Sequence, residues 1–149
     1  MRRFVKRLLI GIGVLLGLLV VMQVVPYGRE HHNPPVVVEP VWDSPRTREL
    51  AVRACFDCHS NQSKWPWYSH VAPLSWVVQH HVNVGREVLN FSEWHRQWDL
   101  AEQSASQILR TEMPPRSYRM LHPEAHLTGE EKVQLARGLH KTLGFEWRE

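Results

Sequence analysis

Hydrophobic residues are concentrated at the start of this chain. A continuous apolar stretch runs from Leu8 to Val25, interrupted only by the polar Gln23. As a helix that rises ~1.5 Å per residue, this stretch would cross roughly 27 Å, close to the thickness of the hydrocarbon layer of a bilayer. The pattern therefore predicts an N-terminal transmembrane helix within residues 1–25.

Basic residues precede this stretch, and no comparable cluster follows it: Arg2, Arg3, Lys6 and Arg7. The positive-inside rule then keeps this end cytoplasmic and exports the chain after Val25. Cleavage as a signal peptide is the alternative, but the segment from Val21 to Tyr27 lacks the small residues of a cleavage site. We therefore expect a single-pass, uncleaved anchor, with the remaining chain exported to the far side of the membrane.

Residues 26–45 are rich in proline, with Pro26, Pro34, Pro35, Pro40 and Pro45. Proline at this density prevents a continuous helix and favours an extended, semi-rigid linker. His31 and His32 lie in this linker without further ligands near them in the sequence, so we expect no metal site there. Residues 46–149 remain as the folded domain, which is long enough for one modest core.

The pattern within that domain predicts helices and almost no strand. Ser44 is a candidate N-cap, and Pro45 would open a helix that runs to Ala54. A second helix should start near Pro73. Its apolar face has spacings of three and four residues and consists of Leu74, Val77, Val78, His81, Val84 and Val88. This face makes His81 a core residue and leaves His80 in solvent.

Two further helices are expected. One runs from about Asp99 to Glu112 and must end before Pro114. Its apolar residues are Leu100, Ile108 and Leu109. The last begins at a capping box of Thr128 and Glu131 and stops at Gly144. Its apolar side consists of Val133, Ala136, Leu139 and Leu143. The domain should therefore be all-α.

Charge and composition narrow the function. The chain has 18 basic and 15 acidic residues, but four basic ones precede the apolar stretch, so the remainder is close to neutral. The sequence pI of about 9.1 therefore results from the basic residues at the N-terminus. The folded part lacks the basic excess that a nucleic-acid-binding protein needs. The 10 His, the 7 Trp and the two Cys within one short window point instead to a metal or cofactor.

That window, Cys55-Phe56-Asp57-Cys58-His59, has the C-x-x-C-H pattern of covalent c-type haem attachment. Two thiols one helical turn apart match the two haem vinyl groups, and His59 would be the proximal iron ligand. A structural zinc site would need two more ligands at comparable spacing. A redox dithiol would need a preceding strand. We therefore expect one covalently attached haem c.

The sixth iron ligand decides between electron transfer and ligand binding. Met113 is the best candidate, because Pro114 and Pro115 stiffen the loop that follows it. A methionine that fills a gap in the core, a histidine ligand, and an open or water-ligated site remain alternatives. The reserve candidates for the ligand are Met120, His122, His70 and His81.

Other residues near the motif could contact the haem. Trp65, Trp67 and Tyr68 could cover the porphyrin and donate hydrogen bonds to its propionates, and Arg86 could pair with a propionate. The aromatic residues could equally build the core. The carbonyl of Pro73 could accept the proximal imidazole N–H.

Together these residues closely resemble the bacterial haem-binding domain family, whose members are small and membrane-anchored with one C-x-x-C-H motif. The similarity spans roughly Pro35 to Gly144. It is carried by Cys55 to His59, Ser60-Asn61-Gln62-Ser63, Trp65 to Tyr68, Ala72 to Trp76, His81-Val82, Gly85-Arg86, Leu89 to Trp94 and Met113-Pro114-Pro115. The resemblance implies covalent haem binding by Cys55, Cys58 and His59, with Met113 as distal ligand. Ser63 departs conservatively from an expected threonine. The helix content is also similar to that of class I cytochromes c, whose first and last helices cross.

We therefore expect a membrane-anchored monohaem cytochrome that exchanges single electrons with a membrane or periplasmic redox partner. The alternative is a haem-based sensor, or a module that binds a small ligand or peroxide at an exchangeable sixth position. An enzyme such as a peroxidase would need a polar distal residue, and the sequence singles out none, so no catalytic residue is predicted.

Overall fold

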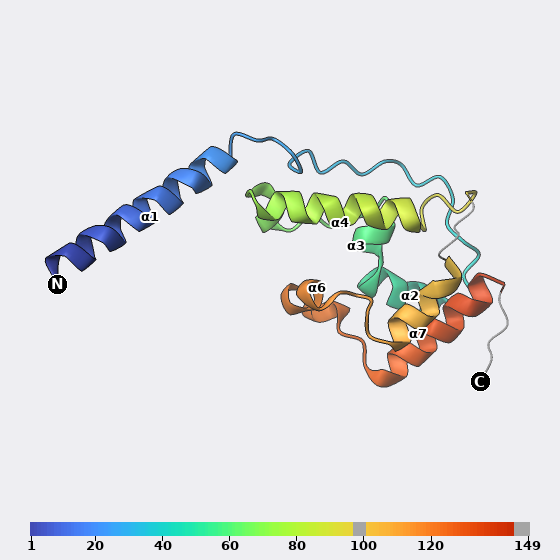
Figure 1. Cartoon of the computed structure of the whole chain (residues 1–149). Helices are drawn as coiled ribbons and strands as arrows, with labels where there is room; N and C mark the ends of the chain where they lie inside the picture. The colour runs from blue at the N-terminus through green and yellow to red at the C-terminus, as the bar shows by residue number, and fades with distance from the viewer. Residues whose placement is uncertain (97–100, 145–149) are drawn as a thin grey trace. The chain divides into compact units, whose positions relative to one another are not determined.

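The computed structural model describes residues 1–96 and 101–144 (Figure 1). These residues form seven α-helices and three short 3-10 helices, and none of them lies in a strand; an isolated bridge joins Val38 and Glu93. The all-α prediction is confirmed. The chain divides into two units. The first contains Met1–His32 and Trp65–His81, and the second contains Asn33–Lys64 and the chain from Val82 onward.

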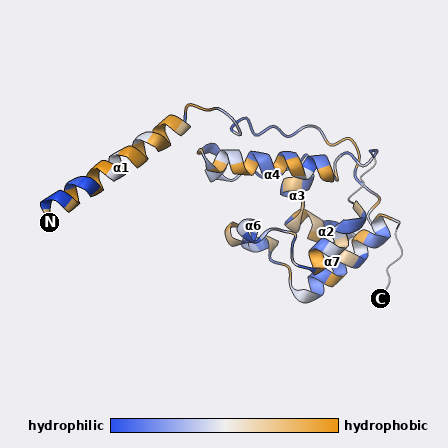
Figure 2. Ribbon diagram, in the orientation of Figure 1, coloured by the Kyte–Doolittle hydropathy of each residue, from blue (hydrophilic) through white to orange (hydrophobic). Residues whose placement is uncertain are grey.

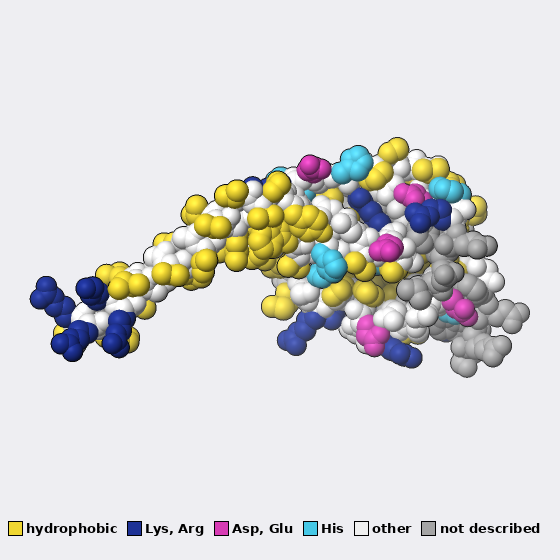
Figure 3. Space-filling view, turned by 45° about the horizontal axis from the view of Figure 1, so that its top comes forward, with side chains coloured by type: hydrophobic (Ala, Val, Ile, Leu, Met, Phe, Trp, Pro, Cys, Tyr) yellow, Lys and Arg dark blue, Asp and Glu magenta, His cyan; other side chains and the backbone are white. Residues whose placement is uncertain are grey.

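In the first unit, α1 covers Arg2–Met22 and is exposed along nearly its whole length. It is long and apolar enough to cross a membrane. Figure 2 shows its hydrophobic colouring, and Figure 3 shows the basic side chains gathered at its N-terminal end. The helix ends before the predicted Val25, where the Gln23 side chain donates to the carbonyl of Leu19. The short helix η1, Trp67–His70, belongs to the same unit.

In the second unit, α2 covers Pro45–Ala54 and α7 covers Gly129–Thr142. The Ser44 side chain accepts a hydrogen bond from the Thr47 backbone N–H, so the predicted N-cap is confirmed. The capping box of Thr128 and Glu131 is present in both directions, and Gly144 has the positive φ of a helix stop. Local cap chemistry therefore sets these boundaries.

The helices α2 and α7 pack against each other, as the likeness to cytochromes c predicts. Gly138 makes this approach possible, because a Cβ added there would lie 2.6 Å from the Thr47 Cγ2. The buried side of α7 consists of Leu135, Ala136, Gly138 and Leu139. Val133 was expected on that side, but it is 37% exposed, so this assignment was wrong. The close approach of the two helices favours small residues, which hydrophobic periodicity does not detect.

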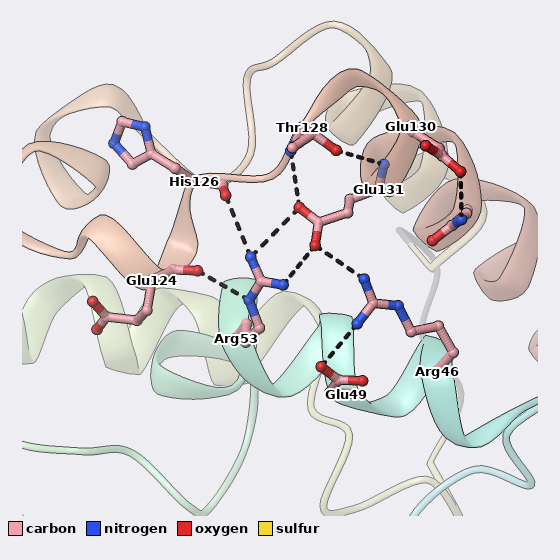
Figure 4. Close-up of polar contacts among 9 residues, drawn as sticks. Arg46, Glu49, Arg53, Glu124, His126, Thr128, Glu130 and Glu131 are labelled. Carbon is pink, nitrogen blue, oxygen red and sulfur yellow. Dashed lines mark hydrogen bonds and ion pairs between the residues drawn. The ribbon is translucent and has the colours of Figure 1, made fainter.

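Ion pairs join α2 to the first turn of α7 (Figure 4). Glu131 accepts hydrogen bonds from Arg53 at 2.7 Å and from Arg46 at 3.0 Å. The bond from Arg53, together with that from the Thr128 backbone N–H, lowers the Glu131 pKa to about 2. Arg53 also donates to the carbonyls of Glu124 and His126, so one guanidinium ties α2 to the segment that leads into α7.

The core of this unit lies between α2, α5 and α7. Its buried hydrophobic residues are Leu50, Ala51, Ala54, Phe56, Leu89, Phe91, Ala101, Ile108, Leu127, Leu135 and Leu139. The helix α5 covers Ser104–Leu109 and follows η2, Ala101–Gln103, so it is shorter than expected. The expected start of that helix, at Asp99 and Leu100, lies outside the described residues. Leu109 is exposed, whereas Ile108 is buried as predicted.

The linker and two further helices complete the described chain. Val37 and Val38 both donate backbone hydrogen bonds to the carbonyl of Ser92, so the end of the proline-rich segment is held to the second unit. The helices α6, Arg116–Leu121, and η3, Pro123–Ala125, were not predicted.

The helix α4 covers Leu74–Val88 and starts where Pro73 predicts, but the expected apolar face was wrong. Leu74, Val77 and Val84 are between 41% and 50% exposed, and His81 is exposed, as is His80. The buried positions include Ser75, Val82 and Gly85. Small residues let neighbouring backbone approach the helix closely, so its packed side contains Gly85 and Ser75 in place of a row of large apolar residues.

Candidate functional site

The two cysteines lie on a tight helical turn directly after α2. Cys55 is both the C-cap of α2 and the N-cap of α3, which covers Phe56–His59. The backbone N–H groups of Cys58 and His59 both donate to the carbonyl of Cys55, at 3.1 and 2.8 Å. Both thiols are free. The motif therefore forms the single turn that its spacing predicts.

The His59 imidazole is oriented by two main-chain carbonyls. Its Nδ1 lies 2.9 Å from the carbonyl oxygen of Gly85 and 3.0 Å from that of Leu89. Because a carbonyl only accepts, the ring hydrogen is on Nδ1, and a neutral ring then presents the Nε2 lone pair to a ligand. Burial lowers the pKa of His59 and outweighs the opposite effect of the two carbonyls. This is the arrangement of a metal-ligating histidine with a fixed tautomer.

We expected the carbonyl of Pro73 to accept the hydrogen bond from the His59 imidazole N–H, and that expectation was wrong. The Pro73 carbonyl accepts backbone hydrogen bonds from Trp76 and Val77 and is used in the first turn of α4. The acceptors for His59 lie at the other end of the same helix. Main-chain carbonyls leave no side-chain signature, so the sequence could not identify them.

Gly85 also sets the distance between α4 and the motif. A Cβ added there would lie 2.9 Å from the carbonyl carbon of Cys58 and 3.0 Å from its Cβ. Both values are shorter than an ordinary van der Waals contact. Gly85 therefore lets the helix backbone touch the motif, and its carbonyl reaches His59 for that reason.

The two thiols lie in an environment that keeps them protonated. Burial raises the pKa of Cys55 to about 12 and that of Cys58 to about 11. Redox-active dithiols have thiol pKa values shifted the other way. The described residues around them also contain no group of three or more His, Cys, Asp or Glu placed to hold a metal ion. The dithiol and zinc alternatives gain no support from this arrangement.

The loop after His59 is held by buried polar residues. Asn61 donates to the carbonyl of Pro35 and accepts from Asn90, whose side chain is 2% exposed. Arg86 donates to the carbonyl of Ser60 at 2.8 Å and to the Ser63 hydroxyl at 3.0 Å. Arg86 is therefore a support of this loop; the expected pairing with a haem propionate stays a prediction.

Tyr118 on α6 contacts the middle of the motif and was not singled out by the sequence. Its hydroxyl donates to one carboxylate oxygen of Asp57, and the other oxygen accepts from the Lys64 backbone N–H. Burial and the neighbouring carboxylate raise the Tyr118 pKa. The Tyr118 ring stacks on His122 with ring centroids 4.1 Å apart. The helix α6 thus bounds the motif on one side.

Met113 lies in the turn after α5, in the same unit as the motif. Its backbone N–H donates to the carbonyl of Gln107 at 3.2 Å, which fixes the turn. Its side chain is 41% exposed. This exposure leaves the thioether accessible, and the role of Met113 as sixth iron ligand stays a prediction.

The aromatic residues after the motif belong to the first unit. Trp65 stacks on His31 with centroids 4.6 Å apart, Trp67 is 78% exposed, and Tyr68 meets Trp67 edge to face. His31 also makes an edge contact with His70, so it has a packing role that the linker interpretation did not anticipate. Contacts of Trp65, Trp67 and Tyr68 with haem stay predictions.

Comparison with known protein families gives a match over most of the chain. A family model described as "Haem-binding domain" matches residues 17–141. This chain belongs to the haem-binding domain family. The match covers most of the chain, including the end of α1, both cysteines and Met113. No curated protein and no solved structure matches this haem-binding domain.

The residues of this haem-binding domain fit the group that its family binds. The two thiols are free and one helical turn apart. The Nδ1 hydrogen of His59 is donated to main-chain carbonyls. At position 85 only a glycine fits, because any side chain there would clash with Cys58. Cys55 and Cys58 would hold the porphyrin edge, and His59 Nε2 would be the proximal ligand.

Proposed function

We propose that this haem-binding domain is a monohaem c-type cytochrome that is anchored in the bacterial inner membrane and transfers single electrons in the periplasm. The observation that carries the proposal is the turn from Cys55 to His59, in which two carbonyls fix the imidazole with Nε2 free. Haem iron supplies one-electron chemistry by cycling between its ferrous and ferric states.

The chain's own residues then set the properties of the site. Gly85 and Leu89 fix the ring orientation of His59 through their carbonyls, and a hydrogen-bonded imidazole is a more basic ligand. Met113 as the sixth ligand would raise the reduction potential relative to two histidines. Covalent attachment through Cys55 and Cys58 would keep the haem in the protein in both redox states.

The location follows from α1. The helix has the length and hydropathy of a membrane span, and basic residues occupy its first turns. The positive-inside rule places that end in the cytoplasm and the haem site in the periplasm, where c-type attachment occurs. A membrane-bound or periplasmic redox protein is the expected partner, and nucleic acid is not.

The alternative is a haem-based sensor, or a module that binds a small ligand or peroxide at an exchangeable sixth position. Absorption spectra of the haem-loaded chain, oxidised and reduced, with and without CO, separate the two. We expect a low-spin spectrum with the weak far-red iron–thioether band and no response to CO. A high-spin or CO-responsive spectrum would contradict electron transfer and support the sensor.

The variant Met113→Ala identifies the ligand. We expect it to lose the far-red band, to bind CO and to show a lower reduction potential. Met120→Ala is the matched control, since Met120 is a second exposed methionine in the same unit. An unchanged spectrum in Met113→Ala would exclude Met113 as the sixth ligand.

A further inference from the structure

The C-terminal end of α1 is bonded to a segment far away in the sequence. The Gln23 side chain donates to the carbonyl of Ala72 at 2.8 Å and accepts from the Ala72 backbone N–H at 3.0 Å. Both backbone groups of Ala72 are thus paired with one side chain, and Ala72 is 1% exposed. The helix end and the corner between η1 and α4 are therefore fixed to each other within the first unit.

A second contact lies a few residues further on. Gly28 has φ +77°, and a Cβ there would lie 2.8 Å from the carbonyl carbon of Ser75. The Ser75 hydroxyl donates to the carbonyl of Tyr27 at 3.4 Å. The chain leaving α1 thus packs on the first turns of α4 without a side chain between them.

The surface of this segment has the chemistry of a membrane interface. Residues 65–81 contain no Asp, Glu, Lys or Arg, although they are largely on the surface. The segment exposes a set of large apolar side chains: Trp67 at 78%, Val71 at 43%, Leu74 at 48% and Val77 at 50%. Tryptophan and tyrosine, both present here, are enriched where the bilayer meets water. The exposed side chains of the segment also include the polar His70, His80 and His81. A set of exposed large apolar side chains without Asp, Glu, Lys or Arg among them marks an interaction site.

We infer that the segment Trp65–His81 lies in the interfacial layer of the bilayer leaflet from which α1 emerges. The occupant of this surface is lipid, because the surface is joined to the end of the membrane-spanning helix through Gln23 and Ala72 and contains no Asp, Glu, Lys or Arg. The inference rests on the proposed anchor. The first unit then attaches to the membrane in two ways: α1 spans the bilayer, and the segment Trp65–His81 contacts its surface. Gln23 and Ala72 join these two parts.

Tryptophan fluorescence of the full-length chain in nanodiscs tests this contact, because α1 contains no tryptophan. The probe is phosphatidylcholine brominated near the headgroup end of its acyl chains, compared with the unbrominated lipid. We expect bromolipid to quench the emission, and Trp67→Phe to reduce that quenching to less than half. Trp94→Phe, which removes a half-buried tryptophan of the second unit, should leave the quenching in place.

A charge in the segment provides an independent test. Leu74 is the first residue of α4, where a carboxylate is favourable for the helix, so Leu74→Glu should fold and still weaken lipid contact. We expect reduced bromolipid quenching with every tryptophan present. Val133→Glu introduces the same charge at an exposed position in the first half of α7 and should leave the quenching unchanged.

Extraction with alkaline carbonate separates failure of the inference from failure of the anchor. A chain that resists extraction and shows no bromolipid quenching would overturn the surface contact and leave the anchor standing. Release by carbonate would overturn the anchor and the inference with it. A haem spectrum that changes in Trp67→Phe while lipid quenching persists unchanged would place Trp67 on the haem and overturn its role at the membrane.

Discussion

Replacing Gly85 by alanine tests the packing of α4 against the haem motif. The new methyl group would lie 2.9 Å from the Cys58 carbonyl carbon and 3.0 Å from the Cys58 Cβ, where ordinary contacts begin at 3.4 Å. These neighbours are main chain and the base of a side chain, so neither can rotate away. The helix must therefore move off the motif, which lengthens the 2.9 Å contact between His59 Nδ1 and the Gly85 carbonyl.

Overpacking of this kind costs about 1 to 3 kcal/mol of unfolding free energy. For a domain of this size, each kcal/mol lowers the melting temperature by about 4 to 8 °C. We therefore expect Gly85→Ala to melt at least about 4 °C below the wild type in thermal unfolding of the haem-loaded chain, followed by circular dichroism. The proximal His59 bond should weaken as well, which the haem spectrum would register as a shift.

Gly129→Ala is the matched control, because no atom lies within 4 Å of its added Cβ and it begins α7. Its melting temperature should equal or exceed that of the wild type, since alanine restricts the unfolded chain. If Gly85→Ala has the same melting temperature as Gly129→Ala and an unaltered haem spectrum, Gly85 does not determine the approach of α4 to the motif.

Two further changes test the helices around the motif. Glu131→Gln removes a carboxylate whose pKa is lowered from 4.5 to about 2, so its stabilisation is complete above pH 4.5 and disappears as the pH falls towards 2. The wild type should therefore be the more stable protein at pH 7 and lose this advantage between pH 4.5 and 2, and a pH-independent difference in melting temperature would refute the assignment. Tyr118→Phe removes the hydrogen bond to half-exposed Asp57, and we expect a loss of about 1.5 kcal/mol in denaturant titrations. No loss would show that α6 is not held to the motif through this bond.

Sequence reasoning succeeded where the determining interactions are local. Ser44, Thr128 and Gly144 were predicted as helix boundaries because a cap satisfies backbone groups within a few residues of itself. The C-x-x-C-H motif was recognised for the same reason, since its residues are neighbours in the sequence and one helical turn holds them.

The remaining features depend on contacts between distant residues. The buried side of α4 is built from Ser75, Val82 and Gly85, and Gly85 has no room for a side chain because it touches the backbone of Cys58. A hydrophobic periodicity identifies large apolar residues and therefore predicted the opposite side. The helix α6 has only six residues, too few for a periodic pattern, and the Tyr118–Asp57 hydrogen bond that joins it to the motif links distant parts of the sequence.

The site shows the same division. The cysteines and His59 could be read from the sequence, whereas the carbonyls of Gly85 and Leu89 that orient the imidazole could not, because any residue has a carbonyl. Arg86 supports the loop after His59, a role that the sequence did not indicate, and its pairing with a propionate stays a prediction. The geometry of the fold, and not the residue type, decides which polar groups face the motif.

The proposed function depends on covalent attachment of haem at Cys55 and Cys58. The most direct measurement is the intact mass of the chain, purified under denaturing conditions after co-expression with a c-type maturation system. We predict that the mass of the wild type is increased by that of one haem and that this haem stays on the protein during acid–acetone extraction. The double variant Cys55→Ser, Cys58→Ser should show the unmodified mass. An unmodified mass in the wild type, or haem that extracts into the organic phase, would contradict the claim.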